Sequence, residues 1–137
     1  MPNWCRILTL TVTLATASGA QAADDWSFIA GKYAVSSDDC KFLATGQPFS
    51  RTLVDKIESE VLTREGITSQ RETHCRFRSS TRETGGTKWI VKSTCEEMGS
   101  ALPDLESIKI TKNPDGSLIV VAENIFDGPL QLKLCRK

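Results

Sequence analysis

The chain has 137 residues, with 17 basic and 17 acidic side chains, one histidine and five cysteines. A formal net charge of zero at pH 7 excludes a protein whose overall charge steers it toward nucleic acid or an anionic membrane. We therefore expect no nucleic-acid partner.

The N-terminal segment has the pattern of a secretory signal peptide. Arg6 is the only charged residue before Asp24, an apolar run covers residues 7–17, and Ala20-Gln21-Ala22 forms an A-x-A cleavage site. Spanning a bilayer takes about 20 mostly apolar residues, so this run is too short for a membrane anchor. We expect cleavage after Ala22 or one residue later and one domain over residues 23–137. We also expect no transmembrane segment after cleavage, and a periplasmic or secreted protein.

Cys5 leaves with the predicted signal peptide, and four cysteines remain: Cys40, Cys75, Cys95 and Cys135. An even number in an exported chain predicts two disulfides. Their wide spacing lacks the close pairs that a zinc site uses, so no metal is expected. We favour Cys40–Cys75 with Cys95–Cys135, which ties the two halves separately. The pairing Cys40–Cys135 with Cys75–Cys95 stays open, because it would fasten the seam of a barrel.

The first half of the domain mixes strand and helix signals. Residues 26–35 predict a strand entered through Gly31, and residues 38–43 predict a short helical turn capped by Ser37. Residues 51–65 fit two structures equally well. The spacing of the apolar residues allows a helix that ends at Gly66, whereas residues 60–63 alone allow a short strand followed by a turn.

The second half alternates as strands do. In residues 68–79, Cys75 and Phe77 face one side, while Glu72, His74, Arg76 and Arg78 face the other. Further strands are predicted at 88–95, 107–112, 118–122 and 130–135, with turns at 84–87, 113–116 and 127–129. The fold class is therefore mainly β: a small antiparallel meander that closes into a barrel or sandwich, with one short helix and two disulfides. If Leu130, Leu132 and Leu134 face the core, Cys135 points away from it.

No catalytic or cofactor motif is present, so we expect a protein that is not an enzyme and binds no cofactor. His74 is expected to be exposed on its strand, and a disulfide at Cys75 would remove the one Cys-His pairing. The alternative from the enzyme class is a small hydrolase whose carboxylates, Asp39, Glu96 and Glu97, meet only in the fold. Trp26, Tyr33 and Trp89 are expected in the core and not around a pocket.

The candidate binding patch is basic. The outward side of the predicted hairpin gathers the five residues Arg76, Arg78, Arg82, Lys88 and Lys92. Arginine forks match the oxyanions of phosphate and sulfate groups, so this patch predicts contact with an envelope polyanion or protein. The leading hypothesis is thus a non-enzymatic periplasmic or secreted binding domain.

A pattern of short stretches runs along the mature chain: Gly31-Lys32-Tyr33-Ala34, Cys40, residues 72–77, residues 89–91, Thr94-Cys95-Glu96-Glu97, residues 115–118 and Cys135-Arg136. This pattern resembles short, uncharacterised four-cysteine envelope proteins of Gram-negative bacteria. That resemblance covers nearly the whole mature chain and implies a periplasmic β-barrel without a stated function. A weaker resemblance, limited to residues 29–36 and Cys40, is to periplasmic inhibitors of secreted metalloproteases. It implies a β-barrel whose N-terminal arm, here Ala23-Asp24-Asp25-Trp26, enters a protease cleft. This chain departs from that family in having four cysteines and Tyr33 where a tryptophan is usual.

Overall fold

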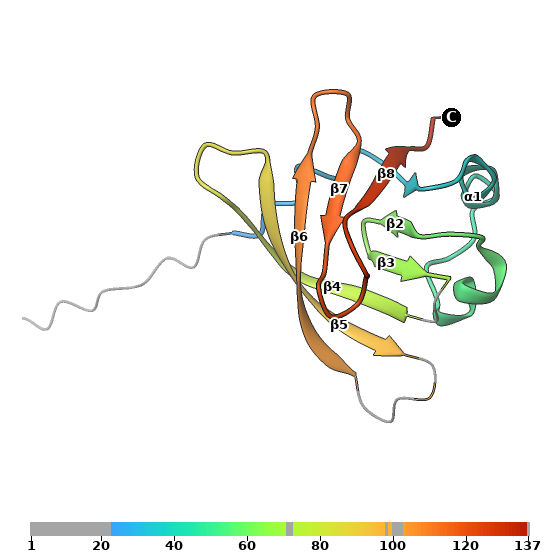
Figure 1. The fold of residues 1–137 in the computed structure, drawn as a ribbon. Helices are drawn as coiled ribbons and strands as arrows, with labels where there is room; N and C mark the ends of the chain where they lie inside the picture. Colours follow the sequence, from blue (N-terminus) through green and yellow to red (C-terminus); the bar gives the residue numbers. More distant parts are fainter. Residues whose placement is uncertain (1–22, 71–72, 98, 100–102, 137) are drawn as a thin grey trace, which may run out of the picture.

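Short alternating segments form the wall of a closed antiparallel barrel (Figure 1). The computed structural model describes residues 23–70, 73–97, 99 and 103–136. Each strand pairs with the next along the chain, and the last pairs with the first. The strands in the described ranges are β1 Tyr33–Ala34, β2 Val61–Thr63, β3 Gly66–Ser69, β4 Thr73–Arg82, β5 Lys88–Glu97, β6 Asp104–Lys112, β7 Leu118–Val121 and β8 Leu130–Leu134. The predicted fold class is confirmed.

The barrel interior is filled by side chains. The inward rows of the strands supply aliphatic residues and the Cys75–Cys95 disulfide, together with the core aromatics Tyr33 and Trp89. Phe28, from the segment that enters β1, and Phe126, from the β7–β8 connection, belong to the same buried cluster. An eight-stranded barrel is just wide enough for such packing. The prediction of Tyr33 and Trp89 as core residues is confirmed, and Trp26 packs half-buried against this core.

A second cluster lies on the outside of the barrel. It is formed under residues 36–60, which we call the cap and which contain helix α1, Ser37–Leu43, and the 3-10 helix η1, Arg51–Lys56. The cap lies beside β2 and β3 in Figure 1 and buries outward-facing Ala34 and Val61 beneath its own apolar side chains. Ser36 caps α1 by accepting a hydrogen bond from the Asp39 amide, one residue earlier than predicted.

The disulfides join Cys40 to Cys135 and Cys75 to Cys95, so the pairing that we favoured is wrong. The β4–β5 register sets Cys75 directly opposite Cys95, with a Cα–Cα distance of 4.0 Å. Closure of β8 onto β1 brings Cys135 within 5.3 Å of Cys40 between Cα atoms, which fastens the seam and the cap together. Cys135 does point away from the main core, and it packs against the outer cluster.

Strands β5, β6, β7 and β8 differ from their predicted bounds by one to three residues at one end, and three other predicted segments differ more. The strand expected over 26–35 shrinks to β1, because the Tyr33 hydroxyl binds the backbone of Phe28 and Ala30 and holds the chain before it in a turn. The strand expected over 68–79 divides into β3 and β4. Residues 51–65 combine both alternatives, with η1 first and β2 after it.

Candidate functional site

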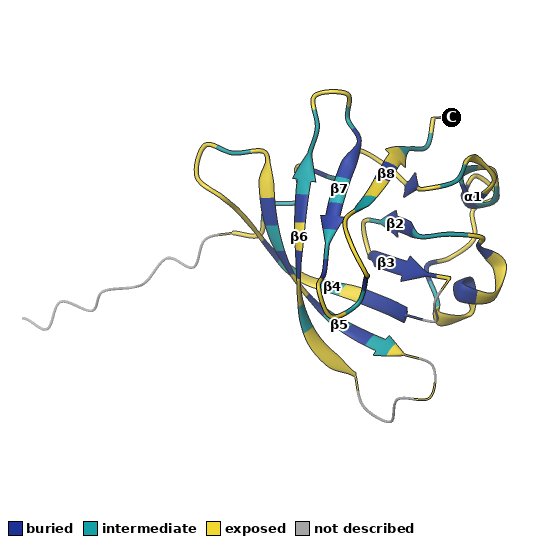
Figure 2. Ribbon diagram, viewed as in Figure 1, coloured by how far each residue is buried: buried dark blue, intermediate teal, exposed yellow. Residues whose placement is uncertain are grey.

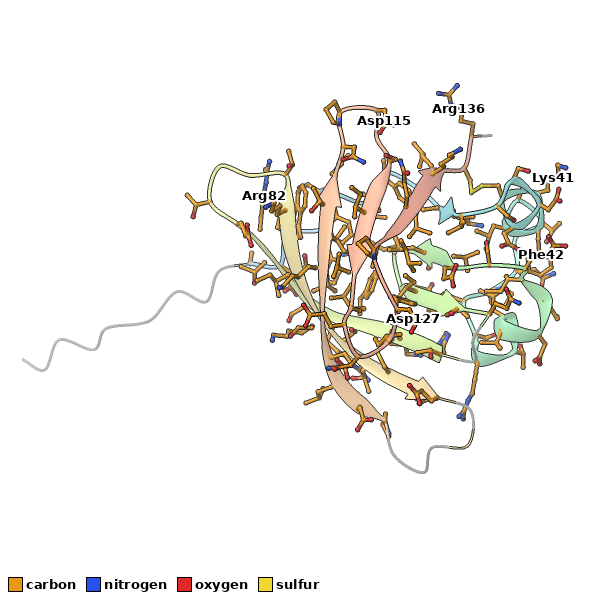
Figure 3. The ribbon with its side chains drawn as sticks, in the orientation of Figure 1. Lys41, Phe42, Arg82, Asp115, Asp127 and Arg136 are labelled. Atoms are coloured by element: carbon orange, nitrogen blue, oxygen red, sulfur yellow. A yellow bond between two sulfur atoms is a disulfide. The ribbon has the colours of Figure 1, made fainter. Side chains whose placement is uncertain are left out.

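A β-bulge in β4 decides which side chains face the solvent. The register shifts between Phe77 and Ser79, so Arg78 is an extra residue without a Cα partner on β5. Beyond the bulge Arg82 pairs with inward-facing Trp89, and its guanidinium lies 5.1 Å from a ring centroid of that residue. Arg82 Nε also donates to the Gly86 carbonyl, at 2.8 Å. The structure thus separates Arg82 from the other four residues of the predicted patch, at the turn end of the β4–β5 hairpin (Figure 3).

The remaining cations share the solvent-facing side of three neighbouring strands. Lys109 of β6 joins them, because it pairs with Ile90 between Lys88 and Lys92 and is exposed. We call this surface the basic face and define it by five residues: Arg76, Arg78, Lys88, Lys92 and Lys109. Lys109 was missed in the sequence, although alternation in the strand predicted at 107–112 directs it away from Ile108 and Ile110, which are buried.

Cross-strand contacts hold two of these cations above the sheet. Arg78 Nε donates to Thr94 Oγ1 at 2.9 Å, and Lys92 Nζ donates to Ser107 Oγ at 2.5 Å. On the outward rows of the described parts of β4, β5 and β6 the acidic residue is Glu96, which lies 3.6 Å from an Arg51 nitrogen of η1. The charged side chains on these outward rows are therefore positive, apart from the Glu96 carboxylate, which is already paired with Arg51.

His74 is buried, with 3% of its surface exposed, so the expectation of an exposed strand histidine is wrong. Its outward direction was read correctly, but the cap covers the outer surface at that point. The ring stacks on Phe49 at 4.4 Å between centroids, and Nδ1 lies 2.8 Å from Thr68 Oγ1. Burial, aided by the nearby Arg76 charge, lowers the pKa of His74 to about 4. Cys75, its neighbour, is held in a disulfide as expected.

The candidate catalytic carboxylates have structural surroundings. Asp39 is 2% exposed and accepts hydrogen bonds from the Glu58 and Ser59 amides, at 2.7 and 2.9 Å, and from the Ser59 hydroxyl. Both Asp39 oxygens thereby join α1 to the chain leading into β2. Glu96 and Glu97 are adjacent on β5 and so point to opposite faces. Within the described ranges no group of three His, Cys, Asp or Glu residues is placed to hold a metal ion.

The predicted inhibitory arm lies against the barrel. The Asp25 amide donates to the Ser80 carbonyl at 3.0 Å, and the Ser80 amide donates to Asp24 Oδ1 at 3.1 Å. Trp26 stacks on Phe77 at 6.0 Å between ring centroids. The Arg64 guanidinium lies over Trp26, 4.1 Å from a centroid of the indole ring. These contacts cover the edge of β4 beyond the end of β3, so an arm that entered a protease cleft would first have to release them. Ala23 is exposed.

The fold and surface together define a disulfide-bonded, eight-stranded antiparallel β-barrel protein with one uncovered basic face. No family model, curated protein or solved structure matches the chain. Both resemblances noted from the sequence therefore stay predictions. In the described part of the chain, no helix has the length and apolar character needed to cross a membrane. The predicted signal peptide lies outside the described residues.

Proposed function

We propose that the protein is an exported, non-enzymatic binding domain that holds a sulfated or phosphorylated polyanion on its basic face. The observation that carries this proposal is the segregation of charge. The chain has equal numbers of acidic and basic residues, yet five cations gather on the outward side of β4, β5 and β6. Such a local field attracts an anionic polymer even when the net charge is zero.

The shape of the surface favours a polymer over a small ligand. The described interior is packed with buried side chains, so a ligand would lie on the outside of the wall. Lys92 follows Lys88 by four positions on β5, which corresponds to roughly 13 Å along an extended strand. A chain bearing repeated sulfate or phosphate groups can contact cations at that spacing simultaneously, and the Arg78 guanidinium can bind an oxyanion through two nitrogens.

The two disulfides support the export that this proposal includes. Both disulfides join cysteines far apart in the sequence, and such bonds persist in oxidising compartments such as the periplasm or the extracellular medium. Anionic glycans of the cell envelope are the polyanions available in those places.

Heparin serves as the probe for the test. We expect the protein to bind immobilised heparin, but not neutral dextran, and to elute at a defined salt concentration because added ions screen the contacts. Arg78→Ala/Lys92→Ala should elute at clearly lower salt. Lys56→Ala/Lys133→Ala removes the same charge from exposed positions outside the basic face and is the matched control.

Two results would contradict the proposal: elution of the wild type in low salt without retention, or equal loss of retention in both double variants. The second would mean that total charge, and not the basic face, governs binding.

A further inference from the structure

Strand β6 is paired along its full length on one side only. Residues 104–111 of β6 pair with β5, whereas only residues 109–112 of β6 pair with β7. Residues 104–108 therefore lack a described strand on the side of β7. Figure 2 shows the half of β6 that extends past β7 as largely exposed, and Leu105 in it is 83% exposed.

The hydrogen-bond pattern identifies the backbone groups on this open side. The Lys112 amide donates to Thr87, toward β5, and the Asn113 amide donates to Ser117, toward β7. Directions alternate along a strand, so the amides of Leu105 and Ser107 face the β7 side, where in the described chain no backbone carbonyl accepts from them.

Strand β4 has a similar unpaired edge, but that edge is covered. β4 also outruns its neighbour, since β3 pairs only with residues 73–76, but Asp24 and Asp25 cover the exposed edge through Ser80. Proteins normally protect such edges because they are templates for pairing with another chain. In the described chain, residues 104–108 of β6 have no comparable backbone cover on the side of β7.

A hollow of about 350 Å³ lies beside this edge. Its lining comes from β6, from the last residue of β7 and from the chain just beyond β7: Leu105, Glu106, Ser107, Lys109, Val121, Glu123 and Asn124. Its floor offers apolar surface from Leu105 and half-buried Val121. On the opposite row of β6 are Asp104 and Glu106, and Asn124 Nδ2 donates to the Glu106 carboxylate at 3.2 Å.

We propose that this edge, residues 104–108, binds an extended segment of a partner protein that adds as a strand antiparallel to β6, in line with β7. Backbone bonds to Leu105 and Ser107 supply the affinity, and alternate side chains supply the specificity. The row over Leu105 and Val121 takes apolar side chains. The row over the carboxylates of Asp104 and Glu106 takes lysine or arginine. The partner segment thus alternates apolar and basic residues.

A second copy of this chain fits less well. Antiparallel pairing of two β6 edges centred on Glu106 would place identical carboxylates opposite each other, which is unfavourable. Self-association is therefore an outcome that counts against the proposal.

The probe is the end-capped peptide Thr-Val-Lys-Val-Lys-Val-Thr. We expect saturable binding to the full domain, with slowed hydrogen exchange at the amides of Leu105 and Ser107. Methylating the peptide nitrogens that face β6 should abolish binding, and methylating the alternate set should not. Replacing both peptide lysines by glutamate should weaken binding at least tenfold, because those side chains would then meet Asp104 and Glu106.

Variants of the protein complete the test. Ser107→Pro removes the amide on the open side and no backbone bond to β5, and it should abolish binding. Ser107→Ala keeps the amide and should retain binding. Both variants also remove the hydroxyl that accepts from Lys92 Nζ. Hydrogen exchange of the β5 and β7 amides verifies that both variants are folded. Arg78→Ala/Lys92→Ala should bind the peptide as the wild type does, which separates this site from the β4 and β5 part of the basic face.

The proposal is overturned by equal effects of the two methylated peptides, by protection at another edge, by the absence of binding up to about 1 mM peptide, or by dimerisation of the protein through residues 104–108.

Discussion

Gly66 occupies the closest approach between β3 and β4. A Cβ at this position would lie 1.9 Å from the Cys75 carbonyl oxygen and 2.7 Å from Phe49 Cζ. The oxygen belongs to the backbone of a paired strand and cannot rotate away. We expect Gly66→Ala to lower the free energy of unfolding by about 2 kcal/mol or more in a urea titration. At Gly128 an added Cβ meets nothing within 4 Å, so Gly128→Ala should change it little. Equal effects would contradict this account.

His74 makes the stability of the cap dependent on pH. Burial lowers its pKa from 6.5 to about 4, with Arg76 and Arg51 adding to the shift and Glu96 opposing it. A lowered folded-state pKa means that the unfolded chain binds the proton first. Stability is therefore lost as pH falls from about 6.5 and levels off near 4, by up to about 3 kcal/mol. Thr68 Oγ1 contacts Nδ1, whereas Nε2 has no partner in the described chain.

The measurement is urea unfolding of the wild type and of His74→Gln at pH 7 and pH 4.5. Carboxylates titrate in both proteins, so the difference between their pH dependences isolates the histidine. The variant should lose less stability on acidification. Parallel curves would show that His74 does not titrate in this window.

At the scale of elements, the two disulfides differ in accessibility. Cys40 and Cys135 are both partly exposed, whereas Cys75 and Cys95 are 0% and 5% exposed inside the barrel. Since a thiolate must reach the sulfur that it attacks, mild reduction should open Cys40–Cys135 first. Alkylation followed by peptide mass mapping would identify the order. Labelling of Cys75 and Cys95 at the same rate as the other pair would contradict this prediction.

Opening that bond has a local consequence. The cap is linked to the end of β8 through Cys40–Cys135, whereas the hydrogen bonds of Asp39 to residues 58 and 59 lie within the cap. We expect Cys40→Ala/Cys135→Ala to lose roughly 4–5 kcal/mol, as the chain-entropy model gives for a loop of about 100 residues. Hydrogen exchange should accelerate in residues 36–60 more than in β5 and β6. Uniform acceleration would show instead that the cap and the barrel unfold as one unit.

The elements show where the sequence is informative. Alternation identified β5, β6 and β8, because each has one buried face, and a near-continuous apolar run identified β7. Alternation gave the wrong exposure for His74, because it indicates the direction of a side chain and not whether another segment covers that side chain. Alternation also did not identify the disulfide pairing, because the pairing depends on which strands lie next to each other in the barrel. The basic face was largely visible, but Arg82 was placed on it because no local signal marked the bulge before it.

For the whole molecule, the seam between β1 and β8 closes the barrel by joining its first strand to its last. It consists of two residue pairs, supplemented by the Cys135 amide donating to Lys32. Tyr33 reinforces this end from inside, since its buried hydroxyl accepts from the Ala30 amide and donates to the Phe28 carbonyl, each at 3.1 Å. The hydroxyl thus ties the Phe28 segment to the seam.

Tyr33→Phe would leave both backbone groups without that partner. We expect a loss of about 2 kcal/mol in the free energy of unfolding, because buried polar groups without hydrogen bonds are costly. The urea midpoint should fall without a change in slope. An unchanged midpoint would show that solvent or a small backbone movement replaces the hydroxyl.

The extra residue in β4 has a consequence for how this surface can vary. Because Arg78 has no counterpart on β5, the inward pattern on either side of it is complete without it. Omitting Arg78 would leave Phe77 and Ser80 facing the interior, and exchanging it would disturb no packed neighbour inside. The charge of the solvent-facing sheet can therefore change at this one position while the barrel stays as it is.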